Sequence, residues 1–180
     1  HNLRNALAAI ACALAAGVSL PLILEALAGF LPVGGRMQVH ALSGDVFLID
    51  DTYNADPDSV RAAIDVLAGL PAPRVLALGD MGEVGSDEVA MHEEVGAYAR
   101  ARGVNLLCTL GRATRDSARA FGAGAQICES VEEVVNHIQA AGAASILVKG
   151  SRFMKMERVV LALRQTAEGA GATEGAHHVA

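Results

Sequence analysis

The chain has 180 residues, 52% of them apolar, and a formal net charge of −6 at pH 7. This length allows one domain with a substantial core and a small appendage, and the apolar fraction argues against a disordered chain. The acidic balance, with no cluster of Lys and Arg to offset it, argues against a nucleic-acid-binding protein.

The N-terminal segment predicts two packed helices. Apolar residues favour helices over 2–16 and 20–30, and Ser19 is the candidate N-cap of the second helix. The stretch Leu3–Leu31 is strongly apolar, but charged and polar residues at its start and Gly and Pro in its middle interrupt it. No run reaches the ~20 apolar residues of a spanning helix, so we predict neither a membrane span nor a signal peptide.

From residue 34 onward, short apolar strands alternate with helices. Strands are predicted over 37–42, 46–50, 75–78, 106–110, 126–128 and 146–148, and helices over 58–68, 87–102, 113–121, 131–141 and 154–167. The first two strands are joined by a short turn, which indicates a hairpin. The pattern predicts an α/β fold with a mostly parallel sheet, one antiparallel strand and helices on both faces. Residues 168–180 are rich in Gly and Ala, lack periodicity and are expected to be disordered.

Three polar motifs follow three of the predicted strands. They are IDDTYNADP at residues 49–57, LGDMGEVG at 78–85 and KGSR at 149–152. Ligands of open α/β sheets bind beyond the carboxyl ends of the strands, so the motifs predict one site assembled from distant parts of the chain.

In the first motif, Asp50 and Asp51 are suited to bind Mg²⁺ or ribose hydroxyls, and Tyr53 and Asn54 to orient a phosphate or a carbonyl. A loop whose Asp and Asn merely cap the next helix explains the same residues equally well. For this motif alone, neither interpretation is favoured.

The other two motifs have structural alternatives as well. Asp80 and Glu83 in the second motif face a common crevice or belong to a solvated connection. In the third motif, Lys149 is suited to neutralise a phosphate. Arg152 is suited to bind a carboxylate through two N–H groups of its guanidinium, and Ser151 precedes it in the sequence. The alternative is a helix cap with surface charges. The chain has no GxxxxGK[ST] sequence and so no P-loop of its own.

Two further groups are candidates for nucleotide contacts. His1, Asn2 and Asn5 lie on one predicted helix turn, where amides can read an adenine edge or simply begin a solvated helix. Arg36 follows two glycines and is interpreted as a phosphate clamp between domains or as a hinge charge.

Together these segments resemble the Mur ligase family. The resemblance runs in order over nearly the whole chain, through HNLRNALAAIA, GGR, IDDTYNADP, LGDMGEVG with His92 following, and LVKGSR with MERVV. Two positions depart from the usual family pattern: Asp56 stands where Asn is usual, and Val84 where Leu is frequent. Within the family, the chain most resembles the enzymes that add D-alanyl-D-alanine to UDP-N-acetylmuramoyl-tripeptide in peptidoglycan synthesis.

The resemblance implies a three-domain, monomeric ligase that uses ATP and Mg²⁺ and forms an amide through an acyl phosphate. Residues 1–33 would be the last two helices of its central ATP-binding domain, and residues 34–167 its Rossmann-like C-terminal domain. The rest of the parent chain would carry the P-loop and most contacts to Mg²⁺, so the isolated chain would be inactive. A cytoplasmic location fits three cysteines whose odd number and apolar surroundings predict free thiols.

The resemblance also implies roles for single residues, and no metal ligands among them. Nucleotide contacts are expected from Asn5, with Asn2 beside it, for adenine, from Arg36 for a phosphate, and from Asp51 for the ribose. Residues beside the reacting groups, here taken as catalytic, are Tyr53, Asn54 and Lys149. Contacts to the incoming dipeptide are expected from Ser151, Arg152 and Asp80.

A receiver domain that accepts a phosphoryl group is the alternative from a different class. Such domains use paired acids, an acceptor Asp, a Thr or Ser and a Lys at successive strand ends, and this chain offers Asp50, Asp51, Asp80, Thr109 and Lys149 in that order. The Pro that usually follows the Lys is absent, and the leading helices and KGSR are left unexplained. A non-catalytic nucleotide-binding module is a third possibility.

Overall fold

The computed structural model describes residues 2–30 and 33–174, and the chain divides into two compact units, residues 1–33 and 34–180. The predicted contact of His1 and the last six residues of the predicted tail lie outside the described residues. In the described part, no helix is long and apolar enough to cross a membrane.

The N-terminal unit consists of helices α1 (Asn2–Ala15) and α2 (Leu20–Ala28), which confirms the predicted helix pair. The Val18 N–H donates to the Ala13 carbonyl at 3.0 Å and so ends α1 in a tight turn. Ser19 occupies the N-cap position of α2, as predicted, but its hydroxyl makes no capping hydrogen bond with the described residues. Pro at the start of α2 fits the first turn, where a backbone N–H has no partner in the helix.

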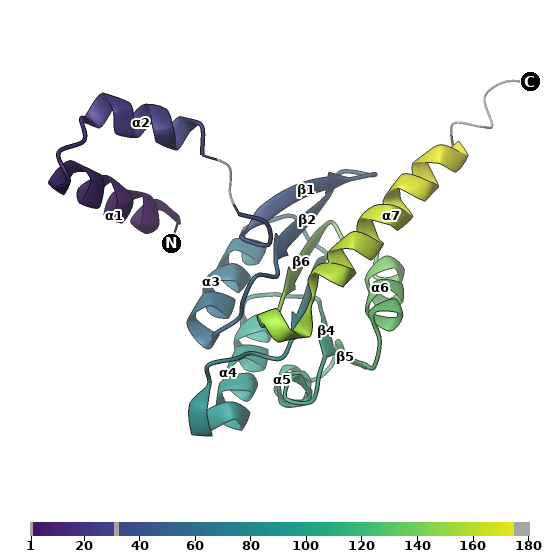
Figure 1. The fold of residues 1–180 in the computed structure, drawn as a ribbon. Coiled ribbons are helices and arrows are strands. Elements are labelled where there is room, and N and C mark those ends of the chain that lie inside the picture. Colours follow the sequence, from purple (N-terminus) through teal and green to yellow (C-terminus); the bar gives the residue numbers. More distant parts are fainter. Residues whose placement is uncertain (1, 31–32, 175–180) are drawn as a thin grey trace, which may run out of the picture. The chain divides into compact units, whose positions relative to one another are not determined.

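The second unit is built on a six-stranded sheet in the order β1-β2-β6-β3-β4-β5 (Figure 1). The strands are β1 (Gln38–Leu42), β2 (Val46–Asp51), β3 (Arg74–Gly79), β4 (Leu106–Leu110), β5 (Ala125–Cys128) and β6 (Ser145–Lys149). Only the β1–β2 pair is antiparallel among the pairs of this sheet, which confirms the predicted mostly parallel, Rossmann-like architecture. The last strand of the chain, β6, lies in the middle of the sheet.

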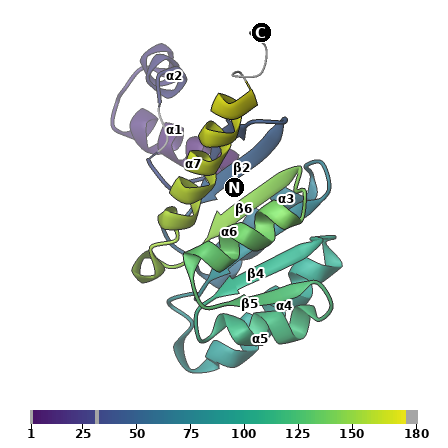
Figure 2. The ribbon, with the colours of Figure 1, turned by 90° about the vertical axis from the view of Figure 1, so that its right-hand side faces the viewer.

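Helices cover both faces of the sheet. They are α3 (Pro57–Ala68), α4 (Glu88–Ala101), α5 (Thr114–Phe121), α6 (Val131–Ala140) and α7 (Glu157–Glu174), with short 3-10 turns η1 (Gly85–Asp87) and η2 (Arg152–Met154). One core cluster joins the strands to α3, α4 and α5, and the other joins them to α6 and α7. Figure 2 shows α6 and α7 on the face turned towards the viewer. Because both faces are covered, the parallel strands are mostly apolar, with polar residues chiefly at their ends.

The start of α3 is fixed by a capping box. The Asp56 carboxylate accepts from the Ser59 N–H at 3.0 Å, and the Ser59 hydroxyl lies 3.2 Å from the Asp56 N–H. Partial burial raises the pKa of Asp56, but the two Ser59 hydrogen bonds and the charge of Lys149 together hold it below its ordinary value. The carboxylate at this position therefore caps the helix as an Asn would.

The last helix differs from the prediction. It begins at Glu157, after η2 and the left-handed residue Lys155, and it continues to Glu174. Residues 168–174, which we expected to be disordered, are helical. Ala is the best helix former and no Pro interrupts this segment, so a helix already nucleated on the sheet extends through it.

Candidate functional site

Lys149 joins the end of β6 to the end of β2. The strand register sets Lys149 beside Asp51, and the Lys149 Nζ donates to Asp51 Oδ2 at 2.6 Å and to the Asn54 carbonyl at 2.8 Å. Only 3% of the Lys149 side chain is exposed. A buried ammonium needs such partners, because an unpaired charge is costly in the interior. The first and third motifs are therefore held together by one buried charge.

The second motif joins the same arrangement through backbone groups. The Ala55 carbonyl accepts from the Gly82 N–H at 3.0 Å and from the Ser151 hydroxyl at 3.4 Å. The Ser151 N–H donates to the Asp80 carbonyl at 3.0 Å. The three motif loops thus form one hydrogen-bonded unit at the carboxyl edge of the sheet, as the sequence predicts.

The buried residues of this unit have their polar atoms engaged. Lys149 and Ser151 both bind protein groups, so the geometry supports a role in holding the loops. Asp50 is buried too, and its Oδ1 accepts from the Thr52 N–H at 3.2 Å and the Thr52 hydroxyl at 2.7 Å. Asp50 therefore shapes the loop, and the expected roles of Lys149 at the reacting groups and Ser151 at the dipeptide remain predictions.

Arg36 and Tyr53 form an exposed pair next to this unit. The Arg36 guanidinium lies 4.1 Å from the centre of the Tyr53 ring. The Tyr53 N–H donates to the Gly35 carbonyl at 2.9 Å. Gly35 has a φ of 74°, which favours glycine, and a Cβ there would lie 3.0 Å from the Thr52 hydroxyl and from the Tyr53 nitrogen. Arg36 has no carboxylate partner among the described residues, so its charge is open to an anion.

Asp51 and Asn54 are only partly engaged by the protein. Asp51 uses one oxygen for Lys149, and the other accepts from the Met37 N–H at 3.1 Å. The Asn54 amide lies 3.5 Å from Glu83 Oε1, a long contact across an exposed loop. Glu83 has a φ of 60°, which is rare for a residue other than glycine. Asn54 therefore faces the acidic loop, and its expected role beside the reacting groups remains a prediction.

The remaining predicted residues are distributed differently. The Arg152 guanidinium is exposed and lies 3.3 Å from Glu157, within reach of solvent. Asn5 is exposed on α1 in the N-terminal unit, and the Asn2 side chain lies outside the described part. The structure thus brings Asp51, Asn54, Lys149 and Ser151 together, and the predicted adenine contacts remain predictions.

Asp80 is held by the chain itself. Its carboxylate accepts from the Thr114 N–H, the Thr114 hydroxyl and the Arg112 N–H at 2.8, 3.1 and 3.1 Å. We expected this carboxylate to contact the dipeptide, but its oxygens are instead directed at the turn that precedes α5. The sequence does not reveal this because the partners lie more than 30 residues away.

His92 binds the loop of the second motif through the backbone of Met81. It is fully buried on α4, its Nδ1 donates to the Glu88 carbonyl at 2.8 Å, and its Nε2 accepts from the Met81 N–H at 3.1 Å. These partners fix the neutral imidazole with its proton on Nδ1. A histidine three residues before buried Val95 on the same helix is a sequence signal for this inward position.

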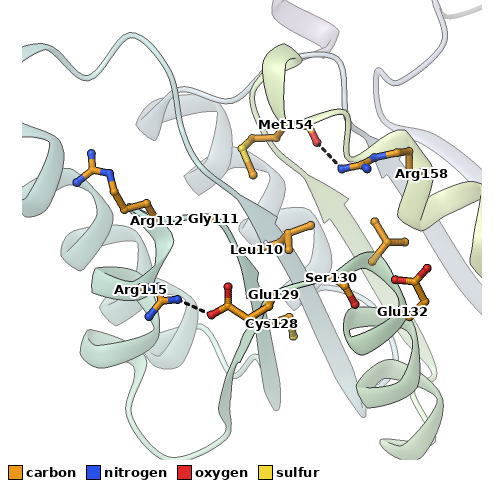
Figure 3. A pocket seen from close by; sticks show the side chains of 11 residues that line it. Leu110, Gly111, Arg112, Arg115, Cys128, Glu129, Ser130, Glu132, Met154 and Arg158 are labelled. Atoms are coloured by element: carbon orange, nitrogen blue, oxygen red, sulfur yellow. Dashed lines mark hydrogen bonds and ion pairs between the residues drawn. The ribbon is translucent and has the colours of Figure 1, made fainter.

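A groove of about 960 Å³ lies at the carboxyl ends of β4 and β5 (Figure 3). Its lining comes from four segments of the chain, namely residues 110–115, residues 128–132, Met154 and Arg158. The Glu132 N–H and the Ser130 hydroxyl donate to the Glu132 carboxylate and hold its pKa below the ordinary value. Sequence analysis missed this groove, because none of its residues belongs to the three motifs.

The receiver alternative does not fit this geometry. Its acceptor would be Asp80, but that carboxylate is bound by the 112–114 turn, and Lys149 pairs with Asp51 instead. Thr109 is buried and donates to the Gln126 carbonyl at 3.2 Å. The residues that matched the receiver order are therefore not assembled as one phosphoacceptor site.

Comparison with known proteins identifies the class. Residues 35–152 match the family described as Mur ligase, glutamate ligase domain, and the chain belongs to the Mur ligase family. The UDP-N-acetylmuramoyl-tripeptide–D-alanyl-D-alanine ligase of Escherichia coli is 38% identical over 168 residues, which are 92% of this chain and 37% of that protein. The Haemophilus influenzae protein of the same name is 38% identical over 171 residues, which are 91% and 37% of the two chains.

Solved structures agree with the sequence comparison. A crystal structure of MurF from Acinetobacter baumannii has a TM-score of 0.81 and 32% identity, covering 92% of this chain and 37% of that one. MurF ligase from Thermotoga maritima in complex with ADP has a TM-score of 0.77 and, at 22% identity, supports the fold alone. The chain spans little more than a third of the length of the curated relatives it matches.

Proposed function

We propose that the chain is the C-terminal part of an ATP-dependent ligase of peptidoglycan synthesis, which joins D-alanyl-D-alanine to UDP-N-acetylmuramoyl-tripeptide. The observation that carries the proposal is the hydrogen-bonded unit of three motif loops, found in a chain 38% identical to two ligases of that name. Residues 1–33 would be the last helices of the central domain, and residues 34–167 the C-terminal domain. The complete enzyme would act as a cytoplasmic monomer.

In the sheet unit, Arg36 and Asp51 would contact the nucleotide, and the resemblance implies that Asn5, with Asn2 beside it, would contact adenine. The Arg36 guanidinium stacks on Tyr53 and has no carboxylate partner in the described part of the chain, which suits a phosphate. Asp51 lies at a strand end, where a carboxylate suits ribose hydroxyls. ATP supplies the phosphoryl group that activates the acceptor carboxylate as an acyl phosphate. The described residues contain no group of three or more His, Cys, Asp or Glu side chains able to hold a metal. The resemblance implies that Mg²⁺ would be bound mainly by the central domain.

The proposed reaction is favoured by cations and N–H donors that are held in fixed positions. Negative charge develops on the transferred phosphoryl group and then on the tetrahedral intermediate formed when the dipeptide amine attacks. Lys149 keeps the Tyr53–Asn54 loop in place through the Asn54 carbonyl. In the complete enzyme, Tyr53, Asn54 and Lys149 would lie beside the reacting groups. The exposed Arg152 guanidinium, one end of which lies 3.3 Å from Glu157, is suited to bind the dipeptide carboxylate, with Ser151 setting its position.

The test is expression of the complete coding sequence that contains this chain. The purified protein should form the amide from D-alanyl-D-alanine and the UDP-linked tripeptide, with ATP and Mg²⁺ both required, as followed by phosphate release and mass spectrometry. The 180-residue chain alone should show no ligation, since it lacks a P-loop. A complete protein that ligates a different amine, or none, would contradict the proposal.

A variant tests the nucleotide side separately. Arg36→Ala should raise the KM for ATP about tenfold and leave the KM for the dipeptide unchanged, because a charge-assisted phosphate contact is lost. Arg119→Ala is the matched control, since Arg119 is exposed and pairs only with Asp116 on its own helix. Equal KM values for ATP in the two variants would show that Arg36 does not contact the nucleotide.

A further inference from the structure

Asp80 fastens the turn between β4 and α5 to the end of β3. Its Oδ1 accepts from the Thr114 N–H and hydroxyl, and its Oδ2 accepts from the Arg112 N–H. Strands β3 and β4 are neighbours in the sheet, so the residue after one strand holds the turn after the other. Both ends of the turn depend on this one carboxylate.

Gly111 shows how closely the carboxylate and the turn are packed. It has a φ of 136°, and a Cβ built there would lie 2.3 Å from Asp80 Oδ1 and 2.7 Å from Oδ2. Real side-chain atoms do not approach so closely, and L-residues rarely adopt this backbone conformation. A glycine is therefore required for Asp80 to reach the N–H groups of the turn.

The fastened turn forms one wall of the groove at the ends of β4 and β5. Leu110, Gly111 and Arg112 line this wall, and α5 adds Arg115 (Figure 3). The opposite wall carries Glu129, Ser130 and Glu132 at the start of α6, with Arg158 from α7. Arg112 of the turn pairs with Glu88 outside the groove, and Arg115 pairs with Glu129 from the opposite wall. Arg158 binds the Met154 carbonyl, and its charge acts on the Glu132 carboxylate. Charges of both signs therefore line one space, which suits a small ligand that bears both an ammonium and a carboxylate.

We propose that Asp80 is a positioning residue for the amino substrate of the ligase. It does not touch the dipeptide, but it fixes the 111–114 turn that forms one wall of the groove in which the zwitterionic dipeptide binds. This inference rests on the proposed function, and it replaces the direct contact between Asp80 and the dipeptide that the sequence suggested.

Asp80→Asn in the complete ligase tests the inference with a minimal change. The Asn oxygen can keep the Thr114 bonds, but its amide group then faces the Arg112 N–H, and two donors cannot pair. The KM for D-alanyl-D-alanine should rise about tenfold, while the KM for ATP stays within about twofold. Gly111→Ala should also raise the KM for D-alanyl-D-alanine, because the added methyl group displaces the turn. If Asp80→Asn does not fold, the KM of the Gly111→Ala variant tests the inference instead.

Asn105→Ala is the matched structural control. Asn105 Oδ1 accepts from the Arg74 N–H at 2.8 Å and so joins the same two strands at the opposite edge of the sheet. It should lower the melting temperature without changing either KM. If both Asp80→Asn and Gly111→Ala lower the melting temperature but leave the dipeptide KM unchanged, Asp80 is merely structural and the inference is overturned. If the wild-type ligase does not use the dipeptide at all, the proposed function fails first and the inference fails with it.

Discussion

The two units of the chain differ in which side chains they bury. The sheet unit buries the ammonium of Lys149, whereas the N-terminal unit leaves large apolar side chains exposed. Those exposed by a third or more are Leu3, Leu7, Leu14, Val18, Leu20, Leu22, Leu24, Phe30 and Val33, and Ile23 alone is buried among the described side chains of this unit. Helices apolar on all sides are typical of helices covered by other protein. The comparison teaches that the sheet unit has a core of its own, whereas the helix pair has the surface expected of helices that pack against other protein.

The largest effect is expected at the buried lysine. Lys149→Met leaves Asp51 and the Asn54 carbonyl without their partner, so the free energy of unfolding of the chain should fall by about 3–5 kcal/mol. Lys155→Met, at the exposed Lys that follows η2, should change it by less than about 0.5 kcal/mol. Urea denaturation followed by circular dichroism measures both, and equal midpoints would show that the buried pair does not matter.

Truncation of one leucine in each unit sharpens the comparison. Leu147→Ala, at a fully buried position of β6, should lower the free energy of unfolding by about 2–5 kcal/mol. Leu7→Ala, at a side chain that is 56% exposed, should change it by less than about 0.5 kcal/mol in the 180-residue chain. If Leu7→Ala lowered the free energy of unfolding by a similar amount, Leu7 would be buried in solution, and the two units would not differ in this respect.

The smallest effect concerns the cysteines. Burial, with a contribution from Cys128, raises the pKa of the Cys108 thiol to about 12, so the folded chain keeps a proton that the unfolded chain releases near its ordinary value of 9.0. Stability should therefore fall as pH rises above about 9, by at most ~1.4 kcal/mol per pH unit. Urea midpoints at pH 8 and pH 10 test this, and Cys108→Ala should reduce the slope. An unchanged slope in that variant would contradict the assignment.

A thiol reagent gives the same contrast between units at neutral pH. Cys12 is exposed on α1, whereas Cys108 and Cys128 are buried in the sheet unit. One thiol should react within seconds and two only after denaturation. Three equally fast thiols would show that the core of the sheet unit opens readily.

Much of the fold follows from local patterns in the sequence. Alternating apolar strands and capped helices locate nearly every element, and the motif at residues 149–152 is placed correctly at the end of a strand. The strand order is not local information, so the central position of β6 appears only in the structure. The end of α7 was also predicted wrongly, because Gly in a tail suggests disorder although the helix tolerates it.

The site was predictable in outline and not in its contacts. Residue types at strand ends locate the three motifs, but they do not show that Lys149 and Ser151 point into the protein. Partners of Asp80 lie on a turn that has no motif of its own, and the groove is lined by charges that read as ordinary surface residues. Such contacts depend on which strands become neighbours, and that is decided by the whole fold.

The central position of β6 has a consequence for biosynthesis. Until residues 145–149 have left the ribosome, the β1–β2 hairpin and strands β3 to β5 lack the strand that joins them into one sheet. The Lys149–Asp51 pair closes a loop of 98 residues and is among the slow, long-range contacts of folding. The three motif loops therefore come together only when synthesis of this unit is nearly complete. A nascent chain that ends before Ser145 leaves β2 and β3 without the strand between them, and it exposes unpaired strand edges in place of a partial binding site.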